Sequence, residues 1–83
     1  MQQFIRYISN SAKALELKMW SNGINYIIQL SGMPVNIHTG YATTGTDCED
    51  EYTTENNINH FELCRTLNDA ARVYEEWKGR YME

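Results

Sequence analysis

The chain has 83 residues, of which 42% are hydrophobic and 12% are aromatic, and it carries a net charge of −4. This length gives room for one hydrophobic core, so we expect a single domain over residues 1–83, and the hydrophobic content excludes a disordered chain. The acidic balance and the lack of any run of Lys or Arg argue against direct nucleic-acid binding and favour a protein partner with a basic surface.

Three strands are expected in the first part of the chain. Residues 4–9 concentrate β-branched and aromatic side chains, which predicts a strand. Apolar and polar residues alternate over 13–20 and again over 24–30, a pattern typical of half-buried strands. Asn22-Gly23 lies between these two runs and is the strongest two-residue hairpin signal, because both turn positions need a positive φ.

The turn at Asn22-Gly23 predicts a register that gives the hairpin two different faces. The apolar face is expected to pair Met19 with Tyr26, Leu17 with Ile28 and Leu15 with Leu30. The outer face is expected to carry Glu16, Lys18, Trp20, Asn25, Ile27 and Gln29.

The register of the first strand stays open between two alternatives. A two-residue turn at Asn10-Ser11 puts Tyr7 opposite Ala14 on the outer face, whereas a shift by one residue buries Tyr7 opposite Leu15. Arg6 suits the second register better. The choice decides whether Tyr7 is available to a partner.

The middle of the chain changes character after Pro34. Alternation predicts a short fourth strand over 35–39. Residues 40–57 are rich in Thr, Asn, Asp and Glu and are expected to form a long, solvated, acidic connection. The weakly apolar segment 58–63 forms an edge strand or a short helix, and the strand is preferred.

The C-terminal part predicts an amphipathic helix over residues 66–81. Thr66 is a hydroxyl N-cap candidate, Asp69 follows three residues later as a capping-box acid, and apolar residues recur at helical spacing as far as Tyr81. We therefore expect an α+β fold, in which an antiparallel sheet of about four strands carries this helix on one face.

Residue types that could support catalysis or metal binding do not occur in a typical arrangement. Cys48 and Cys64 lack zinc-site spacing, the pair of His60 with Cys64 is better explained by structural roles, and Glu49-Asp50-Glu51 lacks the spacing of a calcium loop. We expect no enzyme activity, no cofactor and no metal.

The predicted location is the cytoplasm. The first residues lack the features of a signal peptide, and the apolar runs are too short to cross a bilayer. Reduced cysteines and no membrane role are expected.

The outer face of the hairpin is the candidate binding site, because exposed aromatic residues grouped on a rigid sheet are typical of interface hot spots. The alternative is that another segment, such as the 41–57 connection, covers this face. The predicted partner-binding residues are Tyr7, Glu16, Lys18, Trp20, Asn25, Ile27, Gln29 and Ser31. The acidic residues that are candidates for contact with a basic partner are Asp47, Glu49, Asp50, Glu51 and Glu55.

Three features of residues 1–30 carry a resemblance to a known family. They are the segment Phe4-Ile5-Arg6-Tyr7-Ile8-Ser9, an apolar strand that ends in Trp20, and Asn22-Gly23. In these features the chain resembles small phage-encoded anti-CRISPR proteins that inhibit type I-F surveillance complexes. The resemblance implies a four-stranded antiparallel sheet whose open face docks on Cas7-type backbone subunits and blocks hybridisation of target DNA.

The resemblance also implies roles for single positions. Tyr7 and Trp20 match positions at which that family presents tyrosines to the backbone subunit, whereas Ser31 stands where the family has a contacting acid. The expected function is therefore a non-catalytic inhibitor, with a monomer favoured over a homodimer. The alternative is a small regulatory or adaptor protein that acts through homodimerisation or partner binding.

Overall fold

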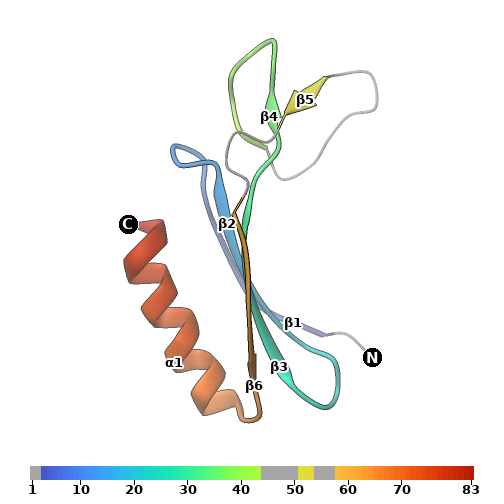
Figure 1. Ribbon diagram of the computed structural model, residues 1–83, viewed down its shortest axis with the longest axis vertical. Helices are drawn as coiled ribbons and strands as arrows, with labels where there is room; N and C mark the ends of the chain where they lie inside the picture. The colour runs from blue at the N-terminus through green and yellow to red at the C-terminus, as the bar shows by residue number, and fades with distance from the viewer. Residues whose placement is uncertain (1–2, 44–50, 54–57) are drawn as a thin grey trace.

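A four-stranded antiparallel sheet with one helix along one face forms the body of the protein (Figure 1). The computed structural model describes residues 3–43, 51–53 and 58–83. The elements of this body are β1 (Gln3–Asn10), β2 (Leu15–Ser21), β3 (Tyr26–Gly32), β6 (Asn59–Cys64) and α1 (Leu67–Trp77). The strand order is β1-β2-β3-β6, and the α+β fold predicted from the sequence is confirmed.

The fourth strand of this sheet is β6, so the strand alternative for residues 58–63 is correct. The expectation that residues 35–39 form a strand of the same sheet is wrong. Only Val35–Asn36 are extended, as β4, because the Asn36 side-chain oxygen accepts hydrogen bonds from the backbone N–H groups of His38 and Thr39. These contacts close a turn and end the strand.

β4 belongs to a separate arm that extends beyond one end of the main sheet (Figure 1). It pairs with β5 (Tyr52–Thr53), which lies inside the segment expected to be an irregular connection. The base of the arm is attached by a small apolar cluster of Ala14, Met33 and Val35. The Met33 N–H also donates to the Ala14 carbonyl at 2.7 Å.

The β2–β3 hairpin has a longer turn than its sequence predicts. Ser21 pairs with Tyr26, and the Asn22 side-chain oxygen accepts from the N–H groups of Ile24 and Asn25 at 2.9 and 2.7 Å. Four residues therefore lie in the turn instead of two. The cross-strand partners shift by two positions, and a shift of two leaves every strand residue on its predicted face.

β1 pairs with β2 in a register that differs from both predicted alternatives. Tyr7 lies opposite Lys18, on the outer face as the first alternative requires. A register shift between Phe4 and Arg6 makes Ile5 an extra residue, which is a β-bulge. Arg6 points to the helix side, where its guanidinium lies 3.3 Å from a Glu75 carboxylate oxygen.

The core lies between the inner face of the sheet and α1. Leu17, Met19, Ile28 and Leu30 are fully buried there, and Ala70 and Tyr74 of α1 pack against them. Leu15 and Cys64 complete the sheet side of this cluster. Burial of such side chains stabilises the fold by about 1.5–3 kcal/mol each.

The helix begins and ends as a capped element. The Thr66 hydroxyl accepts from the Asp69 N–H at 3.2 Å, which confirms the predicted N-cap. A π-helical turn, η1 (Lys78–Met82), continues the helix beyond its predicted end and buries Met82 in the core. The side chains of Asn10 and Lys13 then donate to carbonyl groups of the last three residues.

Candidate functional site

The face of the sheet opposite α1 is the candidate site, and we call it the outer face. Within the described part of the chain, α1 and η1 pack on the other face, and no helix or strand packs on this one. Its side chains form three rows that run across the strands. The rows are Phe4–Trp20–Ile27–Leu63, Tyr7–Lys18–Gln29–Phe61 and Ser9–Glu16–Ser31–Asn59.

The first row is entirely apolar, and its two ends are exposed. Phe4 on β1 is 68% exposed and Leu63 on β6 is 67% exposed, whereas Ile27 in the middle of the row is only 8% exposed. Phe61 in the second row adds a further aromatic ring that is 54% exposed. An apolar strip of this kind on an uncovered sheet face is the type of surface that partners bury.

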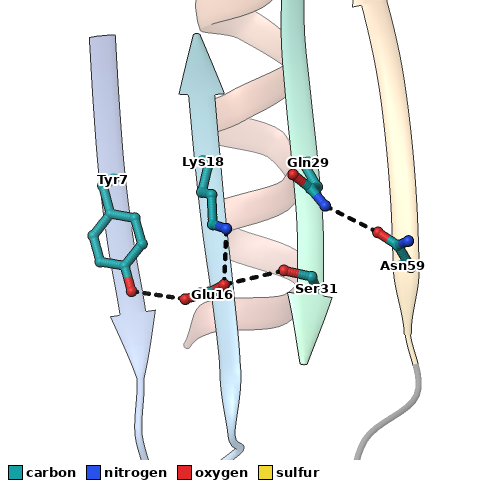
Figure 2. Close-up of polar contacts among 6 residues, drawn as sticks. All are labelled: Tyr7, Glu16, Lys18, Gln29, Ser31 and Asn59. Atoms are coloured by element: carbon teal, nitrogen blue, oxygen red, sulfur yellow. Dashed lines mark hydrogen bonds and ion pairs between the residues drawn. The ribbon is translucent and has the colours of Figure 1, made fainter. Parts of the chain in front are cut away.

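The polar rows are organised around the carboxylate of Glu16 (Figure 2). One Glu16 oxygen accepts a hydrogen bond from the Tyr7 hydroxyl at 2.9 Å. The other lies 2.9 Å from the Lys18 ammonium and accepts from the Ser31 hydroxyl at 3.3 Å. Three neighbouring strands are thus tied together on the outer face. The half-buried carboxylate needs such donors, since it has lost part of its hydration.

A second contact extends the polar rows to the edge of the sheet. The Gln29 side-chain amide donates to the Asn59 side-chain oxygen at 3.1 Å, which links β3 with β6 (Figure 2). Figure 2 also shows α1 behind the strands, on the far side from these side chains. The polar groups are therefore held in place before any partner arrives, which lowers the entropy cost of binding.

The contact with Glu16 changes the acidity of Tyr7. Partial burial, together with the hydrogen bond and the negative charge of Glu16, raises the pKa of Tyr7 to about 12. The hydroxyl is thus a stable hydrogen-bond donor over the neutral and mildly alkaline range.

A shallow hollow of about 190 Å³ lies between the first two rows. It is lined by Phe4, Lys18, Trp20 and Gln29. Two aromatic walls and two polar side chains suit an apolar side chain that carries a polar end.

A larger hollow, of about 420 Å³, lies where β1 meets α1. Its lining includes Arg6, Tyr74 and Glu75. Arg6 is already paired with Glu75 and lies over the Tyr74 ring at 5.8 Å from the centroid. These contacts join the first strand to the helix, so we interpret this hollow as a structural junction.

Most of the predicted interface residues do lie on one face. Tyr7, Glu16, Lys18, Trp20, Gln29 and Ser31 all belong to the three rows. Asn25 does not, because it lies in the longer turn. Ile27 has the predicted orientation, but the expectation that it is exposed is wrong, since Trp20 and Leu63 flank it in the same row.

The acidic residues are only partly described. Glu51 is exposed and lies next to β5 in the arm. The remaining predicted acidic residues, Asp47, Glu49, Asp50 and Glu55, lie outside the described residues, as does Cys48.

Five residues of the outer face were not among the predicted interface residues: Phe4, Ser9, Asn59, Phe61 and Leu63. Three of them belong to β6. If 58–63 is taken as a strand next to 24–30, its alternation puts Asn59, Phe61 and Leu63 on one face. The alternation is therefore visible in the sequence, but no local pattern indicates which strand β6 pairs with.

His60 and Cys64 lie on the helix side of β6, away from the outer face. Cys64 is 8% exposed, and burial, followed by the charges of Glu62 and Asp69, raises the pKa of its thiol. A raised pKa disfavours the nucleophilic thiolate. The lack of catalysis stays a prediction, and within the described part of the chain no cluster of metal-binding side chains is found.

Comparisons of the chain with protein-family models, with curated proteins and with solved structures gave no match. Among the described residues, no helix is both long enough and apolar enough to span a membrane.

Proposed function

We propose that this protein is a non-catalytic inhibitor that docks its outer face on a basic, nucleic-acid-binding surface of another protein. The observation that carries the proposal is the outer face itself, where an apolar row with exposed ends lies beside a polar network that is already ordered. A net charge of −4 favours encounter with a basic surface. Occupying such a surface would inhibit by excluding the nucleic acid.

The partner that we propose is a type I CRISPR surveillance complex, bound at its Cas7-type backbone subunits. This choice rests on the resemblance of residues 1–30 to anti-CRISPR proteins. Its support is that Tyr7, Trp20 and Ser31, the three positions matched to that family's contacts, all belong to the outer face.

Ser31 stands where the anti-CRISPR family has an acidic residue. The structure nevertheless puts a carboxylate close to this position. The Ser31 hydroxyl donates to Glu16 at 3.3 Å, so a carboxylate from the neighbouring strand lies beside Ser31. Glu16 is thus our candidate for the acidic contact.

Truncation of a central aromatic contact should cost more binding free energy than loss of any polar contact at the rim.

The test uses Trp20→Ala with a purified type I surveillance complex. We expect the wild-type chain to bind the complex and to prevent hybridisation of target DNA in a gel-shift assay. Trp20→Ala should weaken binding by about 2 kcal/mol or more, which is about 30-fold in Kd, with an unchanged circular dichroism spectrum.

The matched control is Tyr41→Ala, which removes an aromatic side chain that is 78% exposed but lies on the arm. It should leave the affinity unchanged. If the wild-type chain does not bind the complex, the proposed partner is wrong. If it binds and Trp20→Ala binds equally well, the outer face is not the interface.

A further inference from the structure

The two edges of the main sheet differ, and the difference concerns β6. The β1 edge is interrupted by the bulge at Ile5, a feature that hinders further strand pairing. β6 pairs with β3 in an unbroken register and contains no proline or lysine. Residues 59–63 are all exposed, and no described strand lies beyond β6.

The backbone groups on this edge can be assigned. The Gly32 N–H donates to the Ile58 carbonyl at 3.2 Å, and the β3–β6 register, continued by one pair beyond Ser31 and Asn59, puts these two residues opposite each other. In an antiparallel ladder every second residue bonds to the same neighbour, so His60 and Glu62 bond to β3. Asn59, Phe61 and Leu63 therefore direct their N–H and C=O groups to the open edge.

We infer that β6 pairs antiparallel with β6 of a second copy of this chain, with Phe61 on the two-fold axis. This inference is independent of the proposed function. It joins two four-stranded sheets into one sheet of eight strands. The outer faces of both copies then form one continuous surface, and the exposed Phe61 and Leu63 side chains each gain a neighbouring side chain from the second copy.

The charges on β6 select this register. An axis at Glu62 would put two carboxylates opposite each other, and an axis at His60 would pair two imidazoles. An axis at Phe61 puts each His60 opposite Glu62 of the second copy, where the imidazole can donate to the carboxylate. Side chains that lie directly opposite each other on neighbouring strands stabilise a sheet when they attract each other, and like charges in such positions destabilise it. The two His60–Glu62 pairs would also be non-hydrogen-bonded pairs, in which the side chains lie closer together than in hydrogen-bonded pairs.

The aromatic and apolar side chains fit the same register. With the axis at Phe61, the two Phe61 rings become directly opposite neighbours on the outer face. Each Leu63 lies opposite Asn59 of the second copy. A strand from an unrelated protein would need to match this alternation of charge, whereas a second copy carries it by symmetry.

The test measures the mass of the full chain by sedimentation and light scattering over a wide concentration range, without any surveillance complex. We expect a shift from one chain to two with rising concentration. His60→Glu and Glu62→Lys should each raise the dimer Kd about tenfold, because His60→Glu puts two carboxylates opposite each other at both positions and Glu62→Lys removes both imidazole–carboxylate contacts. Mixing the two variants should restore a mixed dimer with an affinity near that of the wild type.

The control for the change in net charge is Glu51→Lys, on the exposed arm, which should leave the dimer Kd unchanged. A constant mass of one chain overturns the inference, as does a dimer that the two charge variants leave intact or that their mixture fails to restore. Phe61→Pro tests whether a strand of the surveillance complex occupies this edge instead. The substitution removes an N–H that points away from β3 and that any strand added at the edge would need. If the wild-type chain stays monomeric and Phe61→Pro loses binding to the surveillance complex that Phe61→Ala, which keeps the N–H, retains, the edge binds a strand of that complex instead. Binding of the complex by a monomer would leave the proposed function standing.

Discussion

Glu16 is the residue on which the polar part of the outer face depends. It receives the Tyr7 hydroxyl from β1, the Ser31 hydroxyl from β3 and the Lys18 ammonium from its own strand. A glutamate on a half-exposed sheet face would usually be mobile in water. Here three donors fix its carboxylate, so the face presents one defined arrangement of polar groups.

The contact between Tyr7 and Glu16 predicts a pH effect on stability. Folding raises the pKa of Tyr7 from 10.0 to about 12, so between these values the unfolded chain loses a proton that the folded chain keeps. Stability contributed by Tyr7 is therefore fully present below pH 10 and is lost as the pH rises towards 12. Urea unfolding from about pH 9 to about pH 11 should show a steeper loss for the wild type than for Tyr7→Phe.

The control for this prediction is Glu16→Gln, which keeps the shape of the side chain and removes its charge. The pKa of Tyr7 should fall in this variant, and the pH dependence should move towards that of Tyr7→Phe. Equal slopes for the wild type and Tyr7→Phe would contradict the role given to this contact.

At the scale of single elements, the β2–β3 hairpin and the C-terminal helix differ in how they use glycine. Gly23 has a φ of +91° in the four-residue turn, a conformation that an L side chain adopts only with strain. Gly79 lies in η1 without a positive φ, and a Cβ atom added there would meet nothing within 4 Å. The turn therefore needs its glycine, whereas the helix only tolerates one.

These two glycines give opposite predictions. Gly79→Ala should raise the free energy of unfolding by about 0.5–1 kcal/mol, because alanine restricts the unfolded chain and favours helix. Gly23→Ala should lower it by about 1 kcal/mol through backbone strain. Urea unfolding midpoints of both variants provide the measurement. Stabilisation by both substitutions would mean that the turn does not hold the positive φ.

At the scale of the whole molecule, the net charge and the apolar row of the outer face act over different distances. The net charge of −4 acts at long range, whereas the apolar row of the outer face acts only on contact. For an inhibitor these parts govern different rates, since attraction speeds the encounter and buried apolar contacts slow release.

The proposed function predicts how binding responds to salt. A rise from about 0.05 M to about 0.5 M salt should lower the association rate with the surveillance complex more than it raises the dissociation rate, because screening weakens long-range attraction. Surface-based binding kinetics would separate the two rates. Trp20→Ala should show the reverse pattern, a faster dissociation with a nearly unchanged association rate.

The sequence by itself determined which side chains share a face. Alternation puts Leu15, Leu17 and Met19 on the core side and Lys18 and Trp20 on the other. This assignment of faces is correct although the predicted register of the β2–β3 hairpin was wrong, because a shift by two positions preserves the period-two pattern. The N-cap of the helix was also readable, since capping depends on residues only three positions apart.

The tertiary structure decided everything that depends on distant neighbours. It assigned the fourth strand to β6 instead of 35–39, which added Phe61 and Leu63 to the outer face. It also buried Ile27, because burial depends on the side chains of adjacent strands. Strand pairing between segments far apart in sequence leaves no local pattern, so the extent of the outer face could be known only from the folded chain.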